Sequence, residues 1–155
     1  LFLILKVSSK SIHSASISSP ETNSNEISSC KKEDDSLFNI SLLSTSPISL
    51  QEFQENIIVD IEYEHSKGFM GFYDPDYLSL EVKDSRLVNA DYYHLIPLNP
   101  PDNELEIKGI IKLEIDAPFI LGSGNLETLF FTIRIQDREE EWSNEISTPL
   151  ISVSR

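Results

Sequence analysis

The stretch Phe130-Phe131-Thr132-Ile133-Arg134-Ile135-Gln136-Asp137 decides the fold prediction, because apolar and polar side chains alternate along it. The apolar side chains of one parity are Leu129, Phe131, Ile133 and Ile135. This period of two is typical of a β-strand that buries one face. A polar segment containing the single tryptophan, Trp142, follows, and residues 145–153 have the pattern of a closing strand. The end of the chain is therefore predicted to be a β-hairpin.

The same alternation recurs upstream of the hairpin. Further strands are predicted at Leu37–Leu43, Asn56–Glu64, Tyr77–Lys83 and Leu105–Ile115. Leu78, Leu80 and Val82 are expected to point into the core, and Gly109 is expected to mark a bulge or bend in a long strand. The turn signals are strongest at residues 99–103 and 122–125. About seven strands without helical periodicity predict an all-β fold, an immunoglobulin-like antiparallel β-sandwich.

The composition excludes some partners. Twelve basic residues stand against 26 acidic ones, which gives a net charge of −14 at pH 7. Such a chain is repelled by nucleic acid and by anionic membrane surfaces. No run of residues is apolar over the length that a membrane-spanning helix requires. Most of the acidic side chains are expected to face solvent, and the sharper alternative is binding of a divalent cation.

The N-terminal region differs from the rest in composition. The apolar run Leu1–Val7 resembles the remnant of a signal peptide, and the absence of an initial Met suggests that the true N-terminus is missing. Ser8–Ser29 is rich in serine and is expected to be mobile, as is its continuation to Ser36. We therefore expect a signal remnant and tether over residues 1–36 and one β-sandwich domain over residues 37–155.

Several stretches, in order, resemble uncharacterised Ig-like lipoproteins of Bacteroidota. They are residues 57–72 (IIVDIEYEHSKGFMGF), 74–87 (DPDYLSLEVKDSRL), 91–98 (DYYHLIPL), Asp137-Arg138 and Trp142-Ser143-Asn144. The resemblance covers roughly Leu37 to Val153. It implies an Ig-like sandwich held by a lipid anchor in the cell envelope, in the periplasm or on the surface face of the outer membrane. It implies no reaction.

Cys30 is the only cysteine, so no disulfide can form within the chain. Small residues precede it in Ile27-Ser28-Ser29-Cys30, and the charged stretch Lys31–Asp35 follows it, as after the lipidated cysteine of such lipoproteins. The segment Glu21–Glu26 is polar where a signal peptide is apolar, which departs from the pattern. Cys30 is the expected lipidation site, and an ordinary exposed thiol is the alternative.

Asp74-Pro75-Asp76 is the candidate metal site. Closely spaced carboxylates in a loop offer the hard oxygen ligands that Ca²⁺ prefers. The loop lacks the rhythm of an EF-hand, and Pro75 makes a good turn without any ion. The alternative reading is therefore a simple turn.

Candidate binding residues are aromatic: Trp142, Tyr92 and Tyr93, together with the neighbouring His94. Trp142 follows a run of three glutamates and either presents its ring to a ligand or packs it on the rim of the core. Residues 92–94 either form a small recognition surface or a partly buried strand or loop.

No motif of a hydrolase, metalloprotease or phosphate-binding loop occurs, so we expect no enzymatic activity and no cofactor. The favoured function is an interaction or structural module that contacts an envelope protein or a glycan. The alternative is a Ca²⁺-dependent adhesion or carbohydrate-binding domain, and a third possibility is an accessory domain of a separately encoded enzyme. Exposed edge strands make weak self-association possible.

Overall fold

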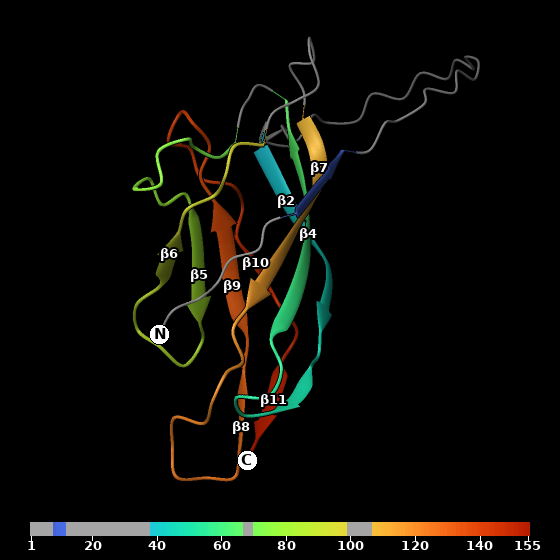
Figure 1. Ribbon diagram of the computed structural model, residues 1–155, viewed down its shortest axis with the longest axis vertical. Helices are drawn as coiled ribbons and strands as arrows, with labels where there is room; N and C mark the ends of the chain where they lie inside the picture. Colours follow the sequence, from blue (N-terminus) through green and yellow to red (C-terminus); the bar gives the residue numbers. More distant parts are fainter. Residues whose placement is uncertain (1–7, 12–37, 67–69, 99–106) are drawn as a thin grey trace, which may run out of the picture.

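The computed structural model describes residues 8–11, 38–66, 70–98 and 107–155, which form strands and loops without any helix (Figure 1). The strands are β1 (Ser8–Ser11), β2 (Phe38–Ser46), β3 (Ser49–Gln51), β4 (Ile57–His65), β5 (Leu80–Asp84), β6 (Asp91–Tyr93), β7 (Ile107–Ile115), β8 (Leu126–Leu129), β9 (Phe131–Ile135), β10 (Ile146–Ser147) and β11 (Ile151–Ser154). The predicted all-β class is confirmed.

One layer is the sheet β1-β7-β4-β2, in which neighbouring strands are antiparallel. Its central pair, β4 and β7, stays in register from Ile57 opposite Ile115 to His65 opposite Ile107. Alternate residues of both strands are buried, as the period of two predicts. The polar residues between them face away from the core.

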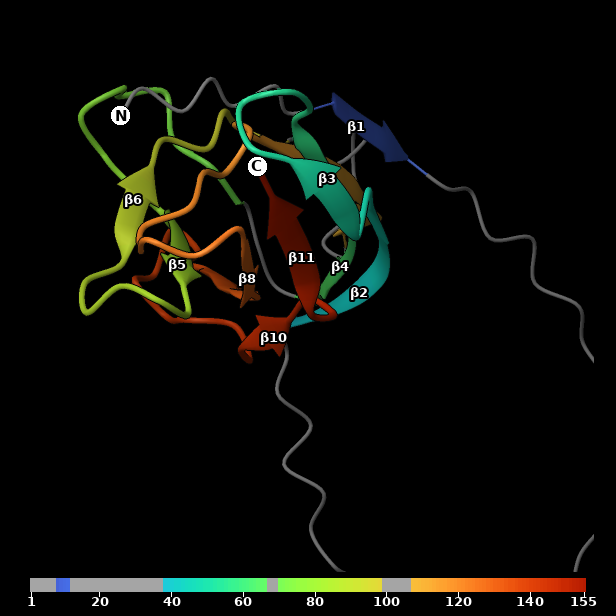
Figure 2. The ribbon, with the colours of Figure 1, turned by 90° about the horizontal axis from the view of Figure 1, so that it is seen from below.

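The facing layer consists of the sheets β10-β9-β5-β6 and β3-β11-β8. These sheets continue into each other, because only Phe130 separates β8 from β9 and only residues 148–150 separate β10 from β11. The break at Phe130 has a local cause: its amide donates to Ser85 Oγ and its carbonyl accepts from the Ser85 amide. Seen end-on, the β2–β4 side and the β5–β6 side lie on opposite sides of the molecule (Figure 2).

The first long strand of the sandwich contributes to both layers. It runs as β2 along β4 up to Ser46, whose peptide bond to Pro47 is cis. It then continues as β3, which pairs in parallel with β11. Such breaks explain why the described residues form eleven strand segments where the sequence predicted about seven strands.

The core lies between the layers and is almost entirely aliphatic. Its fully buried side chains include Ile57, Ile61, Leu113, Ile133 and Ile135. The predicted inward parity of the last hairpin is confirmed, since Leu129, Phe131, Ile133 and Ile135 are all buried. All members of the buried cluster belong to residues 38–153.

Three details of the sequence prediction were wrong. Leu78 is exposed because β5 begins only at Leu80, after a turn. Gly109 makes no bulge; a Cβ there would lie 2.6 Å from Tyr63 Oη, so the glycine leaves room for this ring on the neighbouring strand. Residues Ser8–Ser11, expected to be mobile, pair with β7. Cys30 lies outside the described residues.

No helix in the described residues has the length and apolarity needed to cross a membrane.

Candidate functional site

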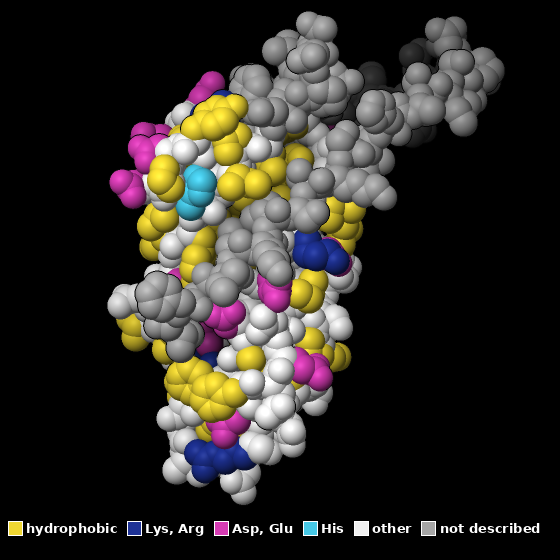
Figure 3. All heavy atoms as spheres, in the orientation of Figure 1, with side chains coloured by type: hydrophobic (Ala, Val, Ile, Leu, Met, Phe, Trp, Pro, Cys, Tyr) yellow, Lys and Arg dark blue, Asp and Glu magenta, His cyan; other side chains and the backbone are white. Residues whose placement is uncertain are grey.

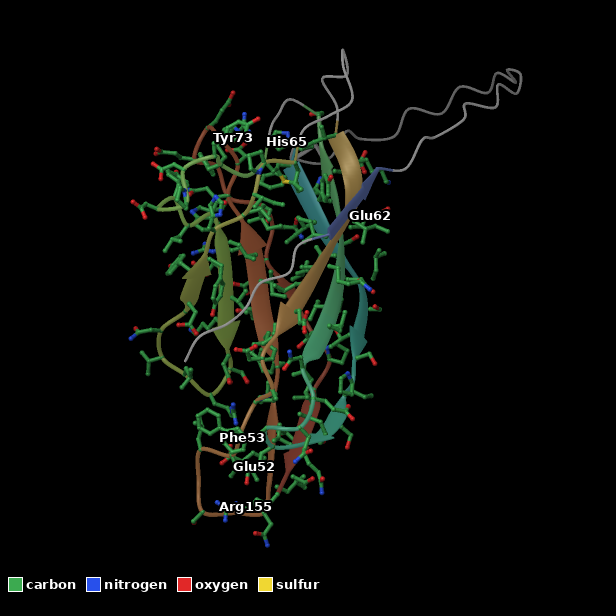
Figure 4. All side chains as sticks on the ribbon, in the orientation of Figure 1. Glu52, Phe53, Glu62, His65, Tyr73 and Arg155 are labelled. Carbon is green, nitrogen blue, oxygen red and sulfur yellow. The ribbon has the colours of Figure 1, made fainter. Side chains whose placement is uncertain are left out.

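Loops from distant parts of the sequence meet at one end of the sandwich, where Tyr73 and His65 lie in Figure 4. Met70 forms β-bridges with both Leu98 and Asp137, so it joins the segment after β4 to the segments that follow β6 and β9. The Leu98 amide donates to the Met70 carbonyl at 2.9 Å, and the Phe72 amide donates to the Leu95 carbonyl at 2.9 Å. Backbone pairing therefore fixes this end of the molecule.

Gly71 makes this close approach possible. Its φ is +77°, and a Cβ at this position would lie 2.1 Å from the carbonyl oxygen of Ile96. Only glycine accepts both the left-handed backbone and the missing space. The Gly71 carbonyl accepts a hydrogen bond from Arg138 Nε at 2.8 Å, which ties the loop to the turn after β9.

A buried pair, His65 and Asp137, links the two layers at this end of the sandwich. His65 Nε2 lies 2.9 Å from Asp137 Oδ2, and each side chain is only 5% exposed. Asp137 Oδ1 also accepts hydrogen bonds from the amides of Glu139 and Glu141, both at 2.9 Å. The carboxylate thus connects one layer to the other and shapes the turn that precedes Trp142.

A row of four side chains crosses the outer face of the sheet β9-β5-β6. The row consists of Trp142, Arg134, Glu81 and Tyr92. Glu81 stands opposite Arg134 on one side and opposite Tyr92 on the other, so strand register alone brings the three together. Their neighbours Leu80 and Val82 face the core, which leaves the row on the outer face.

The centre of the row is an arginine clamp. Arg134 Nε donates to Glu81 Oε1 at 2.9 Å, and Arg134 Nη2 donates to Glu81 Oε2 at 2.7 Å. The guanidinium carbon lies 4.4 Å from the centroid of the Trp142 ring, a cation–π distance. Arg134 is therefore held against the carboxylate of Glu81 and over the indole ring of Trp142 at the same time.

The ionisation of the row follows from these contacts. The hydrogen bond from Arg134 lowers the pKa of Glu81, despite the burial of this carboxyl group. Glu81 in turn raises the pKa of Arg134 and, by accepting a hydrogen bond from the hydroxyl group of Tyr92, raises the pKa of Tyr92. At neutral pH the row carries a fixed ion pair between a half-buried tryptophan and a tyrosine that is 46% exposed.

The remaining predicted aromatic residues have different positions. Tyr93 alternates with Tyr92 and packs against the core, where burial, assisted by Asp91 and Asp116, raises the pKa of Tyr93 to about 12. His94 is half-buried, and its Nε2 lies 2.7 Å from the carbonyl oxygen of Phe72, to which it donates.

Further aromatic rings extend the row toward the loop end. The rings of Phe72 and Tyr77 stack with centroids 3.7 Å apart, and Tyr77 Oη donates to Gln136 Oε1 at 3.3 Å. Gln136 forms a β-bridge with Trp142, which places this stack beside the row.

Asp74 and Asp76 are exposed at the tip of the loop. Asp74 Oδ1 accepts the Asp76 amide at 3.0 Å, and the Asp74 carbonyl accepts the Tyr77 amide at 3.2 Å, which is the bonding of a tight turn. In the described part of the chain, no group of three or more histidine, cysteine or acidic side chains is placed to hold a metal ion. Calcium binding by these residues stays a prediction.

The structure thus brings Trp142 and Tyr92 onto one face and sets Asp74, Asp76 and His94 at the adjoining end. Acidic and hydrophobic side chains lie side by side on the surface there (Figure 3). Glu81, Arg134 and the pair His65–Asp137 were missed from the sequence. The outward parity of Glu81 and Arg134 was visible, but their contact depends on which strands are neighbours.

No protein-family model, curated protein or solved structure significantly matches this chain.

Proposed function

We propose that the chain is an immunoglobulin-like interaction module, anchored by lipid in the cell envelope, that binds a partner through the row Trp142–Arg134–Glu81–Tyr92. The observation that carries the proposal is the locked ion pair between two accessible aromatic rings. Aromatic and arginine side chains dominate the energetics of many binding surfaces, and a preorganised row loses little conformational entropy on binding.

The strand order supports the immunoglobulin-like part of the proposal. The first strand divides between layers, pairing as β2 with β4 and as β3, in parallel, with the last strand β11. The order β3-β11-β8 with β9-β5-β6 follows the arrangement of the sheet that bears the ligand loops in such domains. In this fold the end loops and one sheet face supply the contacts, while the core supplies rigidity.

The binding surface can be tested by site-specific photocrosslinking in cells. A benzophenone amino acid replaces Tyr92 in one variant and, as the matched control, Phe53 in another. Phe53 is 67% exposed and lies at the opposite end of the sandwich (Figure 4). We expect a discrete adduct from position 92 that disappears with Trp142→Ala, and none from position 53. Equal adducts from both positions, or none from position 92, would contradict the proposed surface.

The lipid anchor rests on the sequence around Cys30 and on the resemblance to Bacteroidota lipoproteins. In a full-length gene, Cys30→Ala should move the protein from the membrane fraction to the soluble fraction, whereas Ser29→Ala should leave it in place. If the Cys30 variant stayed in the membrane fraction, the lipid anchor would be rejected, whereas the proposed binding surface at Trp142, Arg134, Glu81 and Tyr92 would be unaffected by this result.

Ca²⁺-dependent adhesion or carbohydrate binding is the second candidate function. The observation that favours it is the exposed acidic turn Asp74–Asp76 beside the stacked rings of Phe72 and Tyr77. A ligand that binds only the folded state raises the melting temperature. Calcium binding therefore predicts a higher melting temperature in Ca²⁺ than in EDTA, and the double variant Asp74→Asn/Asp76→Asn should abolish the difference. No rise up to about millimolar Ca²⁺ would reject this alternative.

A further inference from the structure

β7 lies between β4 and the short edge strand β1 in the sheet β1-β7-β4-β2. β7 has nine residues and pairs with β4 along its whole length without a register shift. On its other side the only strand among the described residues is β1, which pairs with Gly109 to Lys112, four of the nine residues of β7. An exposed strand edge offers unpaired backbone groups to any chain that can align with it.

β1 pairs with less than half of the length of β7. It is a four-residue strand of sequence Ser-Ser-Lys-Ser, joined to β2 through residues 12–37. Ser9 and Ser11 stand opposite Ile111 and Gly109, which are buried positions of β7. The pairing that holds β1 in place is a backbone ladder over four residues of each strand.

The edges at β2 and β6 are protected. Asn144 closes the edge of β2: its Oδ1 accepts the Ile40 amide at 2.8 Å and its Nδ2 donates to the Ile40 carbonyl at 2.9 Å. β2 also carries a register shift between Leu42 and Ser44. β6 has only three residues. Bulges, side-chain caps, short strands, lysines and covering segments are the usual means of preventing edge-to-edge pairing. In the described part of the chain, β7 shows neither a register shift nor a side-chain cap, and its protection consists of Lys108, Lys112 and the four residues of β1.

We propose that the β7 edge pairs with β7 of a second copy of this chain, antiparallel and centred on Ile111, in place of β1. The sequence of β7 is self-complementary in this register. Ile107 meets Ile115, Lys108 meets Glu114, and Ile110 meets Lys112 of the other copy. Each contact occurs twice, as a two-fold interface requires.

The outward face of β7 provides the charge complementarity. Lys108, Ile110, Lys112 and Glu114 alternate with the buried residues, and Lys108 and Lys112 are exposed. Within one copy, Lys108 Nζ lies 3.5 Å from Glu62 Oε1 and 3.6 Å from Glu64 Oε2, and Lys112 Nζ lies 3.8 Å from Asp60 Oδ1, so a second copy would add Glu114 to a set of surface ion pairs. Residues directly opposite each other in an antiparallel pair have Cβ atoms about 5 Å apart, which is within reach of an ion pair. Within one copy, Lys108 and Glu114 are separated by about 20 Å along the strand and cannot contact each other. An interaction between them is therefore specific to the dimer.

Lipid anchoring at Cys30 would also control when the β7 edge becomes available, although the pairing of two β7 strands does not depend on the anchor. Cleavage before Cys30 would remove Ser8–Ser11 and leave the β7 edge uncovered by this segment. The purified, unlipidated chain tests the pairing independently, so a failure of the anchor and a failure of the dimer can be told apart.

The experiment is sedimentation velocity on the whole chain carrying Cys30→Ser, which prevents disulfide-linked dimers. The double substitution Ser9→Pro/Lys10→Pro displaces β1, because proline cannot donate to a strand ladder. We expect the dissociation constant of the dimer to fall in this background. The same two changes at Ser28 and Ser29, which lie outside β1, are the matched control and should leave it unchanged.

Charge exchange then identifies the register. Lys108→Glu alone should raise the dissociation constant about tenfold, because it sets two like charges opposite each other twice. Since Lys108→Glu also disturbs the contacts with Glu62 and Glu64 within one copy, Glu114→Lys, which leaves those contacts in place, should raise the dissociation constant to a similar extent. Lys108→Glu combined with Glu114→Lys should restore it. Lys112→Glu changes the net charge by the same amount as Lys108→Glu and should have a smaller effect, since residue 112 faces Ile110. Circular dichroism confirms that each variant is folded.

Two results would overturn the proposal. One is a protein that stays monomeric up to about 1 mM with β1 displaced. The other is a dimer that Lys108→Glu does not weaken, or that the double exchange does not restore, because such a dimer uses a different surface.

Discussion

Replacing Asp137 with alanine should destabilise the protein strongly, although this residue lies at the end of the sandwich and outside the aliphatic core. Asp137 is 4% exposed and accepts hydrogen bonds from two amides and from the ring of His65, all at 2.9 Å. Alanine removes both acceptor oxygens and therefore all three hydrogen bonds at once. The amides belong to the exposed residues Glu139 and Glu141 and can turn to water, whereas His65 is buried.

The size of the effect follows from these differences. A hydrogen bond to a charged group contributes about 1.5–3 kcal/mol, and a buried group left without its partner costs a similar amount. Counting the His65 contact fully and the two amides in part gives a loss of about 3–5 kcal/mol for Asp137→Ala. Asp137→Asn keeps an oxygen for the amides and should cost less, about 1–2 kcal/mol. A domain with a total stability of about 5–15 kcal/mol is visibly weakened by either change.

Urea denaturation, followed by the fluorescence of the single Trp142, measures these losses and also reports on the turn that Asp137 shapes. Glu140→Ala, an exposed neighbour in the same turn, is the matched control and should change stability by no more than about 0.5 kcal/mol. A loss below about 1 kcal/mol for Asp137→Ala would refute the reasoning, because it would mean that the carboxylate does not hold the two layers together.

Three further predictions concern other parts of the fold. Arg134 lowers the folded-state pKa of Glu81, so the contribution of Glu81 to stability is present above about pH 5 and is lost as the pH falls through the folded pKa. Glu81→Gln should therefore lower stability at pH 7 and make the stability profile shallower on the acid side. Urea denaturation from pH 7 to pH 3 measures both effects. Gly109→Ala should cost about 1–3 kcal/mol in the same assay, because its Cβ meets the Tyr63 ring, and Tyr63→Leu in the same chain should relieve most of this additional cost. Asn144→Ala should speed amide hydrogen exchange at Ile40 more than at the centre of β4, since it removes the side-chain cap of the β2 edge.

Strand positions were predictable because a period of two is a local property. The final hairpin and the buried parity of Asn56–Glu64 needed only the residue types themselves, and the structure has both. Leu78 was misplaced because alternation cannot locate the residue at which a strand begins. Gly109 was misread because a missing side chain indicates a bulge or a close neighbour equally well, and only strand pairing shows that Tyr63 lies across from it.

The candidate site was less accessible to sequence reasoning than the strands. Trp142 and Tyr92 were singled out because aromatic residues next to turns are good candidates on their own. The contact of Glu81 with Arg134 spans 53 residues and that of His65 with Asp137 spans 72, so no local pattern connects either pair. Both pairs arise from strand order, which is a property of the whole fold.

The two proposed surfaces lie on different layers, and this arrangement has a consequence for binding. The row around Trp142 lies on the outer face of β9, β5 and β6, whereas the proposed two-fold contact extends the sheet of β2, β4 and β7 at its edge. Pairing through β7 would leave both copies of the row accessible and fix their separation through a continuous β-sheet. Two rows on a rigid dimer raise the effective concentration of the second binding event, so a partner with repeated sites would be held more tightly than either row alone could hold it. Lys108→Glu should then weaken binding to a multivalent partner while leaving the affinity for a single site unchanged, whereas Trp142→Ala should weaken both.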